Sequence, residues 1–360
     1  MAIPGPLITL LAFVVALGIL VFVHELGHFA VAKRLGVKVL RFSIGFGPVL
    51  FARRHGETEY AVSAMPLGGY VKMLGEEDED EAMAEPERAF ATQSLARRSA
   101  IAAAGPAMNF LFAFLAYALL FLWVGVEVPS TEPRVGGVAA GSPAEQAGLR
   151  AGDRVVTVEG QRMATWEGLA QAVRESQGRP LALTVDRDGT PLSIAVTPKL
   201  RDAGPAGGDP GKQVYLIGIE AWRDWKRVGP LQAIGLAGRQ TATATYLVGQ
   251  GLLHMIQGRV PLRELGGPIA IAQAAGQQAR AGARYFLSML AFLSINLAVL
   301  NLLPIPALDG GHLALFAIEG ALGRPLRPRH RELAQQVGLL LLLSLMVFVF
   351  YNDIHRLVQG

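Results

Sequence analysis

The chain has 360 residues, of which 51% are apolar and 17% are charged, and its mean hydropathy is +0.36. This balance is too apolar for an ordinary soluble enzyme and too polar for a bundle made only of membrane spans. It favours several spans with water-soluble segments between them. The net charge of +4 comes without a basic cluster interleaved with aromatic residues, which argues against nucleic-acid binding. The absence of cysteine excludes disulfides and thiolate metal ligands.

Four apolar stretches are long enough to cross a membrane as helices. They lie at about 7–32, 101–124, 285–303 and 337–351, and the last is short and expected to begin near Leu333 as a tilted helix. The first stretch has no basic residue before it and no small-residue cleavage site after it. We therefore interpret it as a retained span rather than a signal peptide.

Basic residues beside the spans predict their orientation, because short loops rich in lysine and arginine stay in the cytoplasm. Lysine and arginine gather after the first span, before the second, and between the third and fourth. We expect 33–98 and 304–332 to be cytoplasmic, with both termini and the long 125–280 segment outside. Residues 1–125 and 281–360 thus form the two membrane regions.

The first cytoplasmic segment contains alternating apolar residues at 59–73, interrupted by Pro66 and the Gly68–Gly69 pair. This pattern predicts a β-hairpin or a bulged sheet. The acidic run at 76–81 that follows is expected to be a solvated loop.

The external segment predicts a small α+β domain. We expect a strand near 134–138, a short helix ending at Gly148, a strand at 154–158, a helix at 166–175, and two strands joined by the favoured Asp188–Gly189 turn. This order resembles a circularly permuted bacterial PDZ domain. We place the domain at 126–200, and its expected peptide-end loop consists of Val135, Gly136, Gly137 and Val138.

Residues 201–280 are expected to form a linker and an amphipathic helix that lies at the membrane surface. The linker is rich in glycine at 201–212, one further strand is expected at 214–220, and the helix at 229–258.

The first span contains the sequence His24-Glu25-Leu26-Gly27-His28. Two histidines four residues apart lie about 40° apart around a helix, so both imidazoles can bind one Zn²⁺. Glu25 projects onto the same half of the helix, where it can hold and deprotonate a water. Ionisable groups within a span are costly and therefore indicate function. The combination predicts peptide-bond hydrolysis at membrane depth.

A catalytic zinc needs a third protein ligand, and the best candidate is Asp309 in the sequence NLLPIPALDGG that follows the third span. Pro304 and Pro306 end this span and release backbone groups, which is tolerated only where protein or a wet cavity surrounds them. The alternative role for Asp309 is that of a helix cap alone.

Five sequences together resemble the site-2 protease family, most closely its bacterial regulator-of-sigma-E branch: HELGH, GFGP at 45–48, AGPAMNF at 104–110, GGPI at 266–269, and NLLPIPALDGG. The resemblance extends over nearly the whole chain. It implies an intramembrane zinc protease with one zinc held by His24, His28 and Asp309, with Glu25 as the catalytic base. It also implies that Asn301 lies near the reacting carbonyl, although an interhelical hydrogen bond is the alternative for this residue.

The resemblance further implies a membrane-associated β-hairpin that pairs with an extended substrate. Expected substrates are single-span membrane proteins, such as anti-sigma factors or remnant signal peptides, that another protease has already trimmed outside the bacterial inner membrane. One PDZ domain fits the external segment, whereas the best-known enterobacterial relative is expected to carry two. The expected substrate-binding residues are Met65, Gly68, Gly69, Tyr70, Val71, Pro304 and Pro306.

The expected fold is therefore a multi-span α-helical membrane protein with about four transmembrane helices, a cytoplasmic β-hairpin and one extracytoplasmic PDZ domain. Asn109 in the second span is expected to bond between helices rather than assist catalysis, and His312 is not needed as a ligand. A non-catalytic membrane chaperone or adaptor is the rival function. Metal transport is a weaker one, because it requires several stacked polar sites.

Overall fold

The computed structural model describes residues 5–76, 83–202, 213–259, 261 and 266–359. The chain divides into two compact units, each considered by itself below. The first comprises Met1–Trp123 and Gly229–Gly360, and the second comprises Val124–Val228. The expected acidic loop lies outside the described residues except for Glu76, and so does most of the expected glycine-rich linker.

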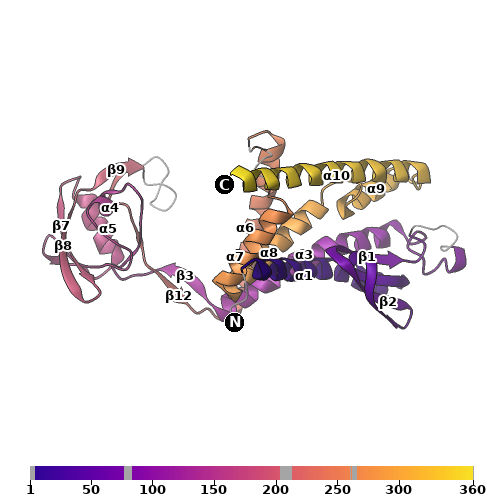
Figure 1. The fold of residues 1–360 in the computed structure, drawn as a ribbon, viewed down its shortest axis with the longest axis horizontal. Helices are drawn as coiled ribbons and strands as arrows, with labels where there is room; N and C mark the ends of the chain where they lie inside the picture. The colour runs from indigo at the N-terminus through magenta and orange to yellow at the C-terminus, as the bar shows by residue number, and fades with distance from the viewer. Residues whose placement is uncertain (1–4, 77–82, 203–212, 260, 262–265, 360) are drawn as a thin grey trace. The chain divides into compact units, whose positions relative to one another are not determined.

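Among the described residues, four helices of the first unit are long and apolar enough to cross a membrane, in agreement with the four expected stretches. They are α1 (Gly5–Arg34), α3 (Leu95–Trp123), α8 (Ala283–Asn301) and α10 (Pro328–Gln359) (Figure 1). The last helix begins well before the apolar run at 337–351. Pro328 explains this difference, because proline is favoured in the first turn of a helix.

The first unit also contains α6 (Pro230–Ile256), α7 (Pro268–Ala281) and α9 (Asp309–Leu322). Helix α6 contacts α3 and α8, and α7 contacts α1. The carboxylate of Asp353 in α10 accepts hydrogen bonds from the backbone N–H of Gly267 and Ile269, both at 2.9 Å. It thereby caps the start of α7, where four N–H groups lack helical partners.

Helices α1 and α3 approach each other closely beside the HExxH sequence. A Cβ atom added to Gly27 would lie 2.3 Å from the carbonyl oxygen of Ala104, so only glycine fits at this contact. Helix α3 is tied to α8 in turn, because the hydroxyl of Ser294 donates to the carbonyl oxygen of Asn109 at 2.9 Å. Small residues and buried hydroxyl bonds are typical of helix contacts within membranes.

The segment after α1 forms two long antiparallel strands, β1 (Val39–His55) and β2 (Thr58–Met73). The β structure expected at 59–73 is present, but its turn lies at residues 56–57, and Gly56 there has a φ of 61°. Residues 41–44 have Cα partners in both 59–62 and 69–72. They therefore form a central strand, and 69–73 lies at an edge.

The second unit contains a four-stranded sheet in the order β6-β5-β7-β8, together with the short helix α4 (Pro143–Gln146) and the helix α5 (Trp166–Glu175). The predictions of a strand at 154–158, a helix at 166–175 and a turn at 188–189 are confirmed. Asp188 and Gly189 have φ angles of 53° and 84°, as a type I′ turn requires. The strands are β5 (Arg154–Val158), β6 (Gln161–Arg162), β7 (Leu181–Arg187) and β8 (Thr190–Val196).

Three further strand pairs complete this unit: β9 with β10, β4 with β11, and β3 with β12. The single strand expected at 214–220 is two strands, which separate at Ile217–Gly218 because Gly218 has a φ of 83°. Residues 213–228 thus fold back onto this unit. The paired strands are β3 (Val126–Pro129), β4 (Val135–Val138), β9 (Lys199–Asp202), β10 (Gln213–Leu216), β11 (Ile219–Ala221) and β12 (Arg223–Lys226).

A buried ion pair stabilises the second unit. Asp153, which is 1% exposed, accepts hydrogen bonds from the Arg187 guanidinium at 2.7 Å and from the backbone N–H of Arg150 at 2.8 Å. Burial alone would raise the pKa of Asp153, but these hydrogen bonds outweigh it and lower the pKa. The carboxylate is therefore ionised and paired at neutral pH.

Candidate metal centre

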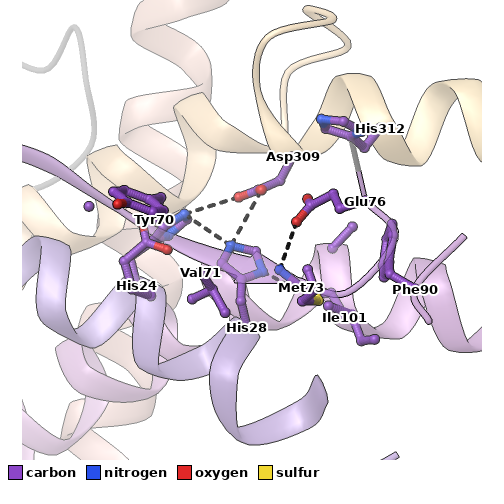
Figure 2. A pocket seen from close by; sticks show the side chains of 13 residues that line it. His24, His28, Tyr70, Val71, Met73, Glu76, Phe90, Ile101, Asp309 and His312 are labelled. Atoms are coloured by element: carbon purple, nitrogen blue, oxygen red, sulfur yellow. Dashed lines mark hydrogen bonds and ion pairs between the residues drawn. The ribbon is translucent and has the colours of Figure 1, made fainter. Parts of the chain in front are cut away.

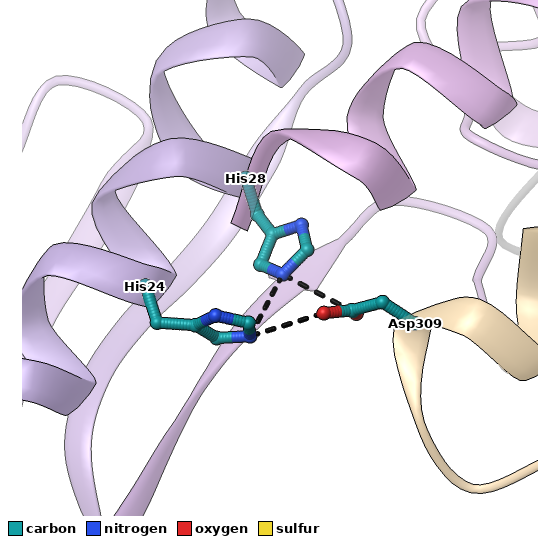
Figure 3. A group of neighbouring side chains, drawn as sticks. All are labelled: His24, His28 and Asp309. Atoms are coloured by element: carbon teal, nitrogen blue, oxygen red, sulfur yellow. Dashed lines mark hydrogen bonds and ion pairs between the residues drawn. The ribbon is translucent and has the colours of Figure 1, made fainter. Parts of the chain in front are cut away.

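Three side chains that are distant in the sequence meet within the first unit (Figure 3). The Nε2 atoms of His24 and His28 on α1 are 3.3 Å apart. Asp309, at the start of α9, places Oδ2 3.1 Å from Nε2 of His24 and Oδ1 3.4 Å from Nε2 of His28. Both histidines are 9% exposed, so the cluster is held inside the protein.

The spacing of these atoms fits one metal ion. A tetrahedral zinc with bonds of about 2.0–2.1 Å separates its ligand atoms from one another by roughly 3.3 Å. The three observed separations of 3.1, 3.3 and 3.4 Å lie close to this value. A His₂-carboxylate set is also a ligand combination that hydrolytic zinc sites use, and it leaves the fourth position open.

The orientation of Asp309 supports the same conclusion. Its Oδ2 atom is buried and has no hydrogen-bond partner, although Nε2 of His24 lies 3.1 Å away. The two groups are therefore close without being directed at each other, and their lone pairs can converge on a shared point. Asp309 makes no capping hydrogen bond to α9, whose N-cap residue is Leu308. The helix-cap alternative is therefore wrong.

The sequence around Asp309 explains how it reaches the histidines. A Cβ atom on Gly310 would lie 2.3 Å from the carbonyl oxygen of Leu303, and one on Gly311 would lie 2.2 Å from that of Ile305. Both glycines are therefore needed for α9 to begin directly against the turn that follows α8. This close packing brings the first residue of α9 to the histidine pair.

Glu25 and the two histidines line a cavity of ≈ 220 Å³. Figure 2 shows Tyr70 and Val71 on the strand that passes beside the histidines. Gly69 on this strand contacts α1 so closely that an added Cβ atom would lie 2.9 Å from Cγ of Glu25. The cavity thus joins the metal ligands, a carboxylate that can transfer protons, and a sheet edge.

His312 also lines this cavity but is not part of the ligand cluster. Burial lowers the pKa of its imidazole, which is therefore neutral near pH 7. Glu76 also lines the cavity and accepts a hydrogen bond from the backbone N–H of Met73 at 3.2 Å.

The other expected site residues lie at different distances from the cluster. The amide nitrogen of Asn301, at the end of α8, is 3.2 Å from Nε2 of His24. Pro304 and Pro306 are in the turn between α8 and α9 and do not line the cavity. Met65 and Gly68 belong to β2 but lie beyond the part of this strand that lines it.

Sequence reasoning missed the contribution of α3 to this site. The imidazole of His28 donates through Nδ1 to the carbonyl oxygen of Ile101 at 2.8 Å. A Cβ atom on Gly105 would lie only 2.2 Å from Nε2 of His28 and 2.7 Å from Cε1 of His24. Gly105 belongs to the AGPAMNF sequence, which contributed to the family resemblance. The sequence does not reveal, however, that this glycine makes room for the two imidazoles.

In the second unit, a hollow of ≈ 470 Å³ lies between α5 and the segment 216–219. The expected peptide-end loop does not border it: Val135 is 0% exposed, and its strand pairs with β11. The segment 216–219 was missed because its apolar residues are typical of an ordinary strand. The lining side chains include Trp166, Leu169, Val173, Leu216, Ile217 and Ile219.

Comparisons with known proteins show the family of the chain. Residues 12–345 match the model of peptidase family M50. The regulator of sigma-E protease RseP from Salmonella typhimurium is 35% identical, and the match covers 97% of this chain and 98% of that protein. RseP of Escherichia coli is 34% identical over the same shares of the two chains.

A relative from Mesorhizobium japonicum, whose name describes it as a zinc metalloprotease, is 38% identical over 96% of this chain and 98% of its own length. That alignment extends over 367 positions. The alignments with the Salmonella and Escherichia proteins extend over 444 and 452 positions, which exceeds the 360 residues of this chain. Those two relatives therefore contain sequence that this chain lacks.

Proposed function

Because the chain belongs to peptidase family M50 and is an intramembrane zinc metalloprotease, we propose that His24, His28 and Asp309 hold one zinc ion per chain at its active site. The observation that carries this proposal is the near-equal separation of 3.1–3.4 Å among the three ligand atoms. The three residues that would hold the ion line the same cavity as Glu25.

A zinc ion held by these three residues would supply Lewis-acid chemistry, which would polarise the scissile carbonyl and activate water for attack. Glu25 accepts the proton from that water and delivers it to the departing amine as general base and then general acid. The amide nitrogen of Asn301 is 3.2 Å from Nε2 of His24. Its N–H can therefore donate to the oxygen of the scissile carbonyl as negative charge develops there.

The substrate, in this proposal, binds as an extended strand along the edge of β2. A transmembrane helix hides its amides in hydrogen bonds and must unwind before hydrolysis, and an exposed edge strand offers it new backbone partners. Residues 69–73 have strand partners on one side among the described residues, and Gly69, Tyr70 and Val71 line the cavity. We assign Met65, Gly68, Pro304 and Pro306 to more distant parts of the same binding surface.

We place the protein in the bacterial inner membrane with both termini outside, because the basic residues flank the segments assigned to the cytoplasm. The active site then lies near the cytoplasmic end of α1. The second unit lies outside as a single PDZ domain, and α6 lies at the membrane surface. The shorter length of the chain relative to its RseP relatives agrees with one such domain instead of two.

We propose that the peptide-end site of this domain is the hollow between α5 and 216–219 rather than Val135–Val138, which do not line the hollow. A groove between a helix and a strand suits a peptide that adds to the strand. A labelled apolar peptide with a free C-terminal carboxylate should bind the full chain more tightly than its amidated twin in an anisotropy titration. Equal binding would contradict recognition of a peptide end.

The substrates we propose are single-span membrane proteins, such as anti-sigma factors or remnant signal peptides, that an upstream protease has shortened. The names of the Salmonella and Escherichia relatives include the regulation of sigma-E. The lipid bilayer is the other partner.

The test compares the detergent-solubilised full chain with its Glu25→Gln and His24→Ala variants on a single-span substrate that lacks its ectodomain. Glu25→Gln removes the proton acceptor but keeps the ligands, so it should retain zinc while cleavage falls by about 10²–10⁴-fold. His24→Ala should lose both zinc and cleavage.

Zinc content is measured in every sample by elemental analysis. Cleavage by Glu25→Gln at the wild-type rate would remove Glu25 from the mechanism. Zinc in His24→Ala equal to that in the wild type would overturn the ligand assignment. Zinc without cleavage of any tested span would favour the adaptor function.

A further inference from the structure

One face of α3 lies along both metal-binding histidines. Ile101, Gly105 and Asn109 follow one another at intervals of four residues, so they share one side of the helix. Ile101 offers a backbone carbonyl to His28, and Gly105 leaves room for both imidazoles. Asn109, which is 0% exposed, places its side-chain amide against His24.

The hydrogen bond from His28 determines which of its nitrogens can bind a metal. A backbone carbonyl can only accept, so Nδ1 of His28 must carry the proton that it donates to Ile101 at 2.8 Å. Nε2 is then left with a free lone pair that faces the cluster. This is the arrangement by which an outer hydrogen bond orients a metal-binding histidine.

His24 requires an equivalent partner. Its Nε2 atom faces Asp309 and His28, so a metal at this position leaves the proton on Nδ1, which then needs an acceptor. The amide of Asn109 lies 3.1 Å from Nδ1 with its NH₂ group nearest, and its Oδ1 atom is buried without a hydrogen-bond partner. Rotating the amide by half a turn brings the acceptor Oδ1 to the protonated Nδ1.

We propose that Asn109 is a positioning residue whose amide holds His24 in the tautomer that binds zinc. With zinc present, Nδ1–H of His24 donates to Oδ1 of Asn109. Without zinc, the NH₂ group of Asn109 donates to Nδ1, and Nε2 of His24 carries the proton. An amide can serve both states because it carries a donor and an acceptor. This inference rests on the proposed zinc site.

Asn301 does not offer the same interaction. Its amide nitrogen is 3.2 Å from Nε2 of His24 and 3.5 Å from Nδ1, so it lies nearer the metal-facing nitrogen. Asn301 is also half-buried, whereas Asn109 is enclosed within the helix contact. A buried amide in a span is costly, and orienting a metal ligand is a function that accounts for it.

The experiment measures the zinc affinity of the full chain in detergent by competition with a chelator. Asn109→Leu has nearly the same size but no acceptor, and we expect it to bind zinc about 10–100-fold more weakly. Asn109→Asp keeps an acceptor at the same position, and we expect it to bind at least as tightly as the wild type. The d–d spectrum of the cobalt-loaded protein should stay unchanged in Asn109→Asp and be altered in Asn109→Leu.

Ser294→Ala is the matched packing control. It removes the hydrogen bond to the backbone carbonyl of Asn109 without touching the amide, so it should keep wild-type zinc affinity. The inference is overturned if Asn109→Leu binds zinc as tightly as the wild type. The inference is also overturned if Asn109→Asp binds zinc more weakly than the wild type. This second test remains available even if Asn109→Leu does not fold.

The His24→Ala variant separates this inference from the proposed function. If the wild type holds zinc and His24→Ala does not, the zinc site is established, whether or not the Asn109 variants change the zinc affinity. If the wild type holds no zinc that depends on His24, the proposed site itself is overturned.

Discussion

At the scale of single residues, the contact of α3 with the metal centre depends on a residue that has no side chain. Gly105 fits between the two helices only because nothing projects from it toward the imidazoles of His24 and His28. Close packing leaves no space to absorb an added methyl group, so the imidazoles or the helix must shift. Metal geometry tolerates such shifts poorly, because the ligand atoms must converge on one point.

We predict that Gly105→Ala lowers zinc content and abolishes most of the cleavage activity, because its Cβ atom would lie 2.2 Å from Nε2 of His28. Overpacking of this kind also costs about 1–3 kcal/mol of stability. Zinc per chain, measured after dialysis against low metal, gives the first readout.

The control for this prediction is Gly18→Ala on α1, where a Cβ atom would meet nothing within 4 Å. That variant should keep zinc and activity. Full zinc content in Gly105→Ala would show that the helices move apart without disturbing the ligands.

At the scale of elements, α9 is anchored at both ends. Asp309 lies at its start, and Glu319, which is 4% exposed, accepts hydrogen bonds near its end. The donors are the Arg98 guanidinium of α3 at 2.9 Å, the Arg331 guanidinium of α10, and the backbone N–H of Leu326 at 3.1 Å. One carboxylate therefore joins three helices on the side of the unit that we assign to the cytoplasm.

Glu319→Gln should destabilise the first unit by about 3–5 kcal/mol, since it leaves two buried or half-buried arginines without their counter-charge. Thermal unfolding of the full chain in detergent measures the loss. Glu332→Gln, a change at an exposed position of α10, should alter stability little. Equal effects of the two variants would contradict the anchoring role.

The same carboxylate predicts a pH dependence. Burial alone would raise the pKa of Glu319, but hydrogen bonds from Arg331, Leu326 and Arg98 outweigh it and lower the pKa below its ordinary value of 4.5. A lowered folded-state pKa adds stability above pH 4.5 that is lost as the pH falls below it. The difference in unfolding temperature between wild type and Glu319→Gln should therefore shrink in acid, and a constant difference would refute this.

At the scale of the whole molecule, the proposed metal ligands come from α1 and α9, so a zinc ion held by them would join segments near opposite ends of the chain. The second unit has its own core of buried residues, which includes Val155, Leu169 and Leu183. Metal binding should therefore stabilise one unit only.

Removing zinc with a chelator should reduce the protection of α1, α3 and α9 from amide hydrogen exchange and leave residues 124–228 unchanged. Zinc at a hundred times its dissociation constant contributes about 2.7 kcal/mol to the state that binds it. Mass spectrometry of peptides from the full chain resolves the two units. Equal loss of protection in both would show that the metal does not act locally.

The sequence alone predicted the four spans and the helix and hairpin turn of the second unit. It also predicted that the HExxH histidines can bind one metal ion and that Asp309 is the candidate third ligand. These depend on local patterns: apolar length, helical spacing and turn chemistry act within a few residues. The tertiary structure alone decided that Gly105, Ile101 and Asn109 face the histidines, that residues 219–226 return to pair with β3 and β4, and that the hollow lies at 216–219. Such contacts depend on how distant surfaces pack, and no short stretch of sequence contains that information.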